Sequence, residues 1–156
     1  LAKEYRCSHI RYAPSHPSVN KTNVYIPFEN LIQLKPNLMN FLTDAVREGI
    51  KPGLECVLPP CIFTTKEWRF LMLFTENLKT ICSPDLEIMP DLSVECCVSM
   101  RGILSSYKVG SKSAQEILER FLWETQKYRN IVLPQCKNCK IFINQVCQGY
   151  CLRLKI

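Results

Sequence analysis

The chain has 156 residues, of which 47% are hydrophobic and 22% are charged. This length suits a single domain, and the composition excludes a disordered chain and a coiled coil. No apolar run approaches the roughly 18–20 residues that a membrane span needs, so we expect none in this chain. Two features are unusual for such a composition, namely ten cysteines and a net charge of +6.

The first part of the chain predicts an arm, a strand and a helix. Residues 1–22 are polar and contain prolines, which indicates an irregular arm. Residues 23–28 carry β-branched and aromatic side chains and predict a short edge strand. A helix is predicted between Pro36, which suits a first helical turn, and Gly49, because apolar residues recur between them at helical spacing.

The middle of the chain predicts an extended segment and a second helix. Residues 54–63 are apolar and contain two adjacent prolines, so we expect an extended segment with a bend. The pattern Thr64-x-x-Glu67 is typical of a capping box and predicts a helix that continues to about Thr80. The apolar run 70–74 is also compatible with a buried strand, and periodicity does not decide between the two.

Residues 91–104 alternate in part between apolar and polar side chains and predict β-structure. Ser113-x-x-Glu116 is a second capping box, and a regular apolar stripe follows it, which predicts a third helix. Trp123 falls outside that stripe. It is either an exposed aromatic available to a partner or a residue at the edge of the core.

The end of the chain predicts β-structure, because residues 131–133, 140–144 and 151–156 alternate between apolar and polar side chains. The sequence therefore predicts an α+β fold with about three helices packed on short, mostly antiparallel strands. We divide it into an irregular arm (1–22), an α+β body (23–130) and a basic, cysteine-rich β segment (131–156) that packs on the body or is appended to it.

The positive charge is concentrated at the end of the chain. The sequence is neutral up to Glu124, its last acidic residue, and the whole +6 comes from the residues that follow. Such a segment favours a polyanion or an acidic protein face, although a solvated surface would explain the charges equally well. The candidate partner-binding residues are Lys137, Lys140, Arg153, Lys155 and Trp123.

The cysteines favour disulfide bonds. Their number is even, and they are spread along the chain at Cys7, Cys56, Cys61, Cys82, Cys96, Cys97, Cys136, Cys139, Cys147 and Cys151. Spread positions suit cross-links that close long loops, and five bridges are expected. The two adjacent cysteines should point to opposite faces of a strand and bond to different partners.

Two further observations bear on the compartment. Asn20 begins an N-glycosylation sequon in a segment that we expect to be exposed. The chain begins with leucine, which is expected either of a mature chain after signal-peptide removal or of a piece of a longer chain. A secreted protein or an ectodomain is therefore the leading prediction.

Zinc is the alternative for the last four cysteines. Cys136, Cys139, Cys147 and Cys151 form the pattern C-x2-C-x7-C-x3-C, and four thiolates can surround a tetrahedral zinc ion. Basic residues around such a module would suit contact with nucleic acid in a nuclear protein. The first two cysteines also have the spacing of a redox pair, but their predicted strand flanks differ from the helix start at which redox pairs lie. No Ser/His/Asp set, phosphate loop or paired carboxylates are visible, so no enzyme is predicted.

The stretch from Cys136 to Cys151 resembles part of the β subunits of glycoprotein hormones, which are secreted cystine-knot proteins. The shared features are the C-x2-C-x7-C-x3-C spacing, a strand similar to Ile-x-Ile-Asn, and Cys-x-Gly-Tyr-Cys. In that family the chain continues to a Cys-x-Cys that closes the knot, so a complete hormone domain is not expected here. The resemblance implies an oxidised cysteine cluster borne on strands, and it implies no activity.

Together these observations predict a disulfide-rich, non-enzymatic protein-recognition module without a cofactor, acting as a ligand or as a subunit of a receptor or complex. Its expected partner is another protein with an acidic face, not a small-molecule substrate. The alternative is an intracellular or nuclear domain whose C-terminal zinc module binds nucleic acid or a partner in a larger complex.

Overall fold

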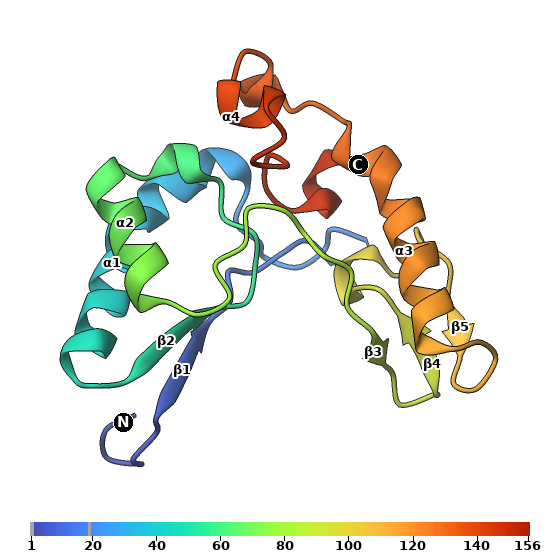
Figure 1. Cartoon of the computed structure of the whole chain (residues 1–156), viewed down its shortest axis with the longest axis horizontal. Coiled ribbons are helices and arrows are strands. Elements are labelled where there is room, and N and C mark those ends of the chain that lie inside the picture. The colour runs from blue at the N-terminus through green and yellow to red at the C-terminus, as the bar shows by residue number, and fades with distance from the viewer. Residues whose placement is uncertain (1, 19) are drawn as a thin grey trace.

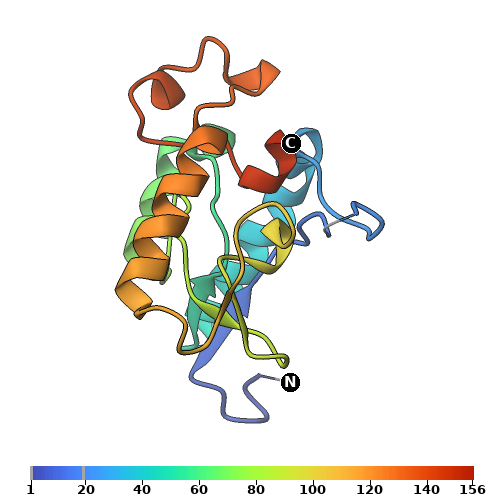
Figure 2. The ribbon, with the colours of Figure 1, turned by 90° about the vertical axis from the view of Figure 1, so that its right-hand side faces the viewer.

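The computed structural model describes residues 2–18 and 20–156, which form an arch (Figure 1). One leg, the first lobe, contains most of the described residues up to 80, and the other leg, the second lobe, contains residues 81–130. Residues 131–156, the C-terminal cap, lie at the apex between the two lobes, and a view turned by 90° shows the cap at the same end (Figure 2).

The first lobe is built on two parallel strands, β1 (His9–Tyr12) and β2 (Lys51–Leu54). Parallel strands need a long crossover connection, and helix α1 (Leu31–Arg47) provides it. Strand β1 lies within the predicted irregular arm, whose residues 1 and 19 are outside the described residues. Residues 23–28 form no strand and lead into a 3-10 turn at Phe28–Asn30, so the predicted edge strand is wrong.

Helix α1 confirms the predicted end but not the predicted start. It begins at Leu31, and Pro36 lies inside it, where the ring removes one helical hydrogen bond. The helix ends at Arg47, and Gly49 (φ +72°) turns the chain two residues later, at the predicted stop. The N–H of Gly49 donates to the carbonyl of Val46 and that of Ile50 to the carbonyl of Ala45, which satisfies two of the carbonyls in the last helical turn.

Helix α2 (Thr65–Phe74) starts with the predicted capping box. The Thr64 N–H donates to Oε2 of Glu67 at 2.7 Å, and the Glu67 N–H donates to Oγ1 of Thr64 at 3.2 Å. The apolar run 70–74 is therefore helical. The helix ends before Thr80 because the following residues run beside β2, where the N–H of Glu76 donates to a backbone carbonyl.

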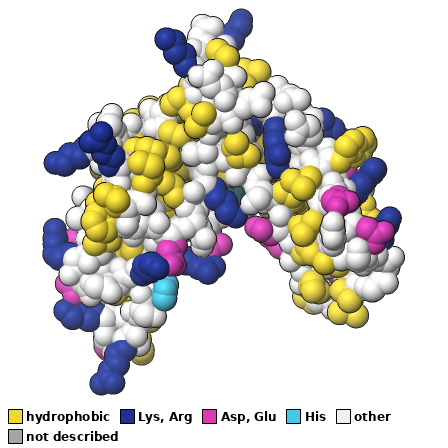
Figure 3. Space-filling model, in the orientation of Figure 1, with side chains coloured by type: hydrophobic (Ala, Val, Ile, Leu, Met, Phe, Trp, Pro, Cys, Tyr) yellow, Lys and Arg dark blue, Asp and Glu magenta, His cyan; other side chains and the backbone are white. Residues whose placement is uncertain are grey.

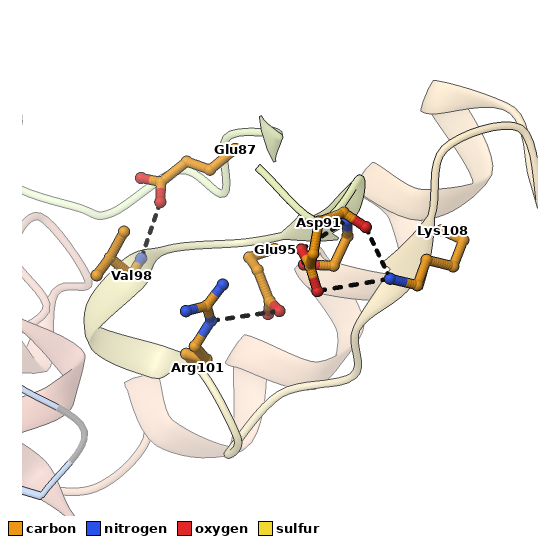
Figure 4. A network of polar contacts seen from close by, with 7 residues as sticks. Glu87, Asp91, Glu95, Val98, Arg101 and Lys108 are labelled. Atoms are coloured by element: carbon orange, nitrogen blue, oxygen red, sulfur yellow. Dashed lines mark hydrogen bonds and ion pairs between the residues drawn. The ribbon is translucent and has the colours of Figure 1, made fainter. Parts of the chain in front are cut away.

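The second lobe packs helix α3 (Ala114–Arg129), which has the predicted capping box at Ser113, on an antiparallel sheet. The strands are β3 (Glu87–Ile88), β4 (Ser93–Glu95) and β5 (Tyr107–Lys108). Polar contacts fasten the sheet to the turn that follows it (Figure 4). Glu87 accepts from the Val98 N–H at 2.9 Å, and the Arg101 guanidinium lies 3.6 Å from Glu95. Of the predicted β-structure at 91–104, only β4 forms.

The C-terminal cap contains no strand within its described residues. Its elements are 3-10 turns at Pro134–Cys136 and Leu152–Lys155 and the short helix α4 (Lys140–Ile143). The predicted β segment is therefore wrong. Left-handed backbone angles at Gln145, Gly149 and Tyr150 turn the chain between the segments that were expected to be strands. The Ile143 N–H donates to the Cys139 carbonyl, which closes a helical turn where a strand was expected.

Two separate hydrophobic cores stabilise the arch. The first is centred on leucines of α1, β2 and α2, and the second lies between β4 and α3. Tyr150 of the cap is fully buried in the first core, and Leu152, only two residues later, is buried in the second. The chain connects the cap only to the second lobe, so the cap is joined to the first lobe through buried side chains such as that of Tyr150.

The α+β class is confirmed, with three substantial helices and short strands in two small sheets. The second sheet is antiparallel as predicted, whereas the first is parallel. Within the described residues, no helix has the length and apolar character of a membrane span.

Glu124 of α3 stabilises the second lobe through hydrogen bonds, and its contribution can be measured. Its buried carboxylate accepts from the Ser105 N–H and from Arg120 Nε, both at 2.8 Å. Burial alone would raise the pKa of Glu124, but these hydrogen bonds outweigh burial and lower it. Replacing Glu124→Gln should lower the free energy of unfolding at neutral pH by about 1–3 kcal/mol, the usual range for such bonds.

Urea titrations at several pH values measure this effect. A lowered pKa means that the stabilisation is present above the ordinary carboxyl pKa and is lost as the pH falls through the pKa of the folded state. The difference between wild type and variant should therefore shrink in acid. The matched control is Glu119→Gln on the exposed face of the same helix. Equal effects of the two substitutions would contradict the assignment.

Candidate functional site

The fold gathers nine of the ten cysteines into three groups, although they are spread along the sequence. Cys56 and Cys151 lie at the first core, and Cys82, Cys96 and Cys97 lie at the second, near enough that Cys97 and Cys82 also help to raise the pKa of Cys151. Four thiols, those of Cys61, Cys136, Cys139 and Cys147, gather at the junction of the first lobe and the cap. Cys7 is exposed on the arm.

Gly149 shows how closely two of the cap thiols approach. Its N–H donates to Sγ of Cys147 at 3.2 Å, and a side-chain carbon at this position would lie 3.2 Å from Sγ of Cys136. The backbone is also left-handed there (φ +80°), so glycine alone fits without strain. Residue 149 therefore leaves room for Cys136 and Cys147 to lie side by side.

Two other cysteines lie on either side of the boundary between the first lobe and the cap. Cys61 follows the first-lobe prolines and lines one groove with Lys140 and Ile141 of α4. Cys139 is the residue directly before α4. The thiol of Cys61 thus faces the start of α4, across the boundary between the lobe and the cap.

The environment of the thiols is apolar. Burial raises the pKa of Cys56 to about 12, and the neighbouring thiol of Cys151 adds to the rise. Burial likewise raises the pKa of Cys61, Cys136 and Cys147. A thiol with a raised pKa stays protonated at neutral pH and is a poor nucleophile. This arrangement favours structural cysteines over a catalytic or redox pair.

The four cysteines predicted as zinc ligands do not come together. Cys136, Cys139 and Cys147 belong to the cap group, whereas Cys151 is drawn into the first core beside Cys56. Across residues 2–18 and 20–156, no three His, Cys, Asp or Glu side chains are arranged to hold a metal ion. The described residues therefore do not assemble the four-cysteine zinc set that the spacing predicted.

Two of the predicted partner-binding residues are buried. Arg153 and Lys155 are each only 8% exposed. Lys155 Nζ donates to the carbonyl of Arg129 at 2.9 Å, at the C-terminal end of α3, and lies 5.1 Å from the ring centroid of Phe142. A cation at that helix end is favourable. Lys155 therefore holds the cap to the second lobe, and the expectation of a surface role for these two residues is wrong.

The other predicted contact residues are exposed. Lys137 and Lys140 lie on the cap, and Figure 3 shows basic side chains at the apex of the arch. Trp123 is 67% exposed on α3, with the Arg120 guanidinium 4.4 Å from its ring centroid. Of the two alternatives for this tryptophan, the structure favours the exposed one. Asn20 of the sequon is exposed as well.

Sequence reasoning missed Tyr150. Its side chain is fully buried, its backbone is left-handed (φ +90°), and its ring packs against His16 and Phe28. Burial raises its pKa well above the ordinary value. Its hydroxyl has no hydrogen-bond partner among the described residues. The preceding Gly149 is the one sequence signal for an unusual backbone here, and it does not indicate burial.

Comparisons with known proteins add no further identification, because no family model, curated protein or solved structure matched the chain. The resemblance to hormone β subunits stays confined to the spacing of the cap cysteines. Where that family has a strand, this chain has the helical turn α4.

The unpartnered hydroxyl of Tyr150 gives a direct prediction. A buried hydroxyl without a partner loses its hydration and gains no bond in return, so Tyr150→Phe should leave the free energy of unfolding unchanged or raise it by about 1 kcal/mol. Chemical denaturation measures the change, with Tyr5→Phe at an exposed position as control. A loss of more than about 1 kcal/mol would show that the hydroxyl has a partner.

Proposed function

We propose that this chain is a secreted or ectodomain protein-recognition module, non-enzymatic and cross-linked by disulfides. The observation that carries the proposal is the gathering of distant cysteines into three groups. Residues as far apart in sequence as Cys56 and Cys151 share one core. Disulfides are typical of oxidising compartments and add stability where a single core is small.

The grouping supports four bridges. In the cap group the pairs are Cys136 with Cys147, which flank Gly149, and Cys61 with Cys139, the nearby thiol that precedes α4. In the cores the pairs are Cys56 with Cys151 and Cys82 with Cys97. Each bridge forms when a disulfide such as oxidised glutathione accepts two electrons from a thiol pair, which yields two glutathione thiols.

The predicted fifth bridge has no support in this fold. Cys7 is exposed on the first lobe, whereas Cys96 is buried in the second core. Cys96 and Cys97 lie at the same core, and with Cys97 paired to Cys82 no further cysteine of that core is left for Cys96. The proposal therefore leaves Cys7 and Cys96 as thiols.

The proposed contact surface is the exposed part of the basic charge. Lys137 and Lys140 stand on a cap that contains no acidic residue, and Trp123 is an exposed aromatic on α3. Aromatic side chains are enriched at protein interfaces, and a positive surface steers the approach of an acidic partner. The exposed sequon at Asn20 is compatible with a secreted chain.

A disulfide map tests the cross-links. The chain is secreted from a eukaryotic cell, its free thiols are alkylated under denaturing conditions without reductant, and its peptides are analysed by mass spectrometry. The four pairs above should be recovered as linked peptides, and the same chain made in a reducing cytosol serves as the control. Pairs that join a cysteine of one group to a cysteine of another, or general alkylation of all ten, would contradict the proposal.

Recognition is tested by measuring how much of a secreted partner protein the immobilised chain retains. The double charge reversal Lys137→Glu/Lys140→Glu should reduce retention of a partner that the wild type binds by about tenfold or more, because it removes complementary charge at the interface. The control Lys66→Glu/Lys112→Glu changes the net charge equally at exposed lysines elsewhere. Equal retention by both variants would refute a contact role for the cap.

A further inference from the structure

A cleft of about 370 Å³ lies between the C-terminal end of α3 and the cap. Figure 1 shows these two parts next to each other at the apex of the arch. Every lining residue except Ile81 comes from residues 126–148. The volume falls in the usual range for ligand sites, roughly 300–1,000 Å³.

The charges that line the cleft are all positive. Arg129 and Lys137 are in its wall, and no acidic residue is among the described residues that line it. Arg129 is already oriented, because its Nη2 donates to the Cys82 carbonyl at 2.7 Å. Lys155 adds a third cation behind the ring of Phe142, which also lines the cleft. A guanidinium and an ammonium in the wall of one cleft, with no acidic residue in its lining, suit a carboxylate.

The cleft also gathers apolar side chains that are otherwise exposed. Ile81, Val132 and Ile143 come from three separate segments and are 40%, 48% and 61% exposed. Single exposed apolar residues are common, but several that converge on one hollow indicate a binding surface. A purely ionic ligand would leave these three side chains uncovered.

We propose that this cleft binds a carboxylate carried beside an apolar group. Lys137 and Arg129 hold the carboxylate, and Ile81, Val132 and Ile143 cover the apolar group. This chemistry is presented by an apolar residue at the free C-terminus of a peptide, and also by a free organic acid. The site shares Lys137 with the proposed contact surface, but it needs neither a particular compartment nor cross-linked cysteines.

The probes are phenylpropionate and the peptide N-acetyl-Gly-Phe with a free C-terminus, each compared with its uncharged amide. Binding to the full ¹⁵N-labelled chain is followed by NMR, and affinities come from calorimetry. The two carboxylate probes should shift the NMR signals of backbone N–H groups in 126–148. Their uncharged amide forms should bind at least about tenfold more weakly, as expected for the loss of a charged hydrogen bond. Binding of the peptide alone assigns a peptide terminus, and binding of the small acid alone assigns an organic acid.

Matched variants locate the site. Lys137→Ala should weaken binding by about tenfold, whereas Lys140→Ala, on the same cap but outside the cleft, should change it by less than about twofold. Ile143→Glu alters an exposed side chain and should abolish binding by placing a negative charge in the cleft. Failure of both carboxylates to bind, equal binding of the amides, or equal effects of the two lysine variants would overturn the proposal.

Discussion

The arch depends on a short stretch of the cap that is buried in both lobes. Tyr150 and Leu154 pack with the first core, and Leu152 between them is buried in the second. A single core in a unit below roughly 70–80 residues rarely supplies more than about 3–5 kcal/mol, so neither lobe has much stability of its own. Insertion of one segment into both cores makes the folding of each lobe depend on the other.

The same stretch explains the chemistry around it. Leu152 and Lys155 belong to the same 3-10 turn, and the hydrogen bond from Lys155 Nζ to the Arg129 carbonyl holds that turn against the end of α3. Cys151 is carried to Cys56, and the turn at Gly149 sets Cys136 beside Cys147. The basic charge of the tail thereby divides in two. Part of it is buried and holds the cap, and part of it, at Lys137, is exposed at a cleft.

Local signals in the sequence predicted local structure well. Both capping boxes and the glycine end of α1 form as expected, because their hydrogen bonds lie within a few residues. Pairing of β1 with β2 was not predictable, since it joins residues about forty apart and neither strand alternates clearly. The prediction of strands in residues 131–156 was wrong for the same reason. The alternation of this segment suits a strand, but burial in two cores and left-handed residues such as Tyr150 decide its path. The spacing of its cysteines likewise did not show that Cys151 lies apart from the other three cap cysteines, beside Cys56.

The most direct test of this account measures the two lobes separately. The chain has two tryptophans, Trp68 in the first lobe and Trp123 in the second, so fluorotryptophan labelling gives one ¹⁹F NMR signal from each lobe. Under reducing conditions, where no cross-link can couple them, urea unfolding should remove both folded signals at one midpoint. Two separate midpoints would contradict the claim that the cap makes the lobes a single cooperative unit.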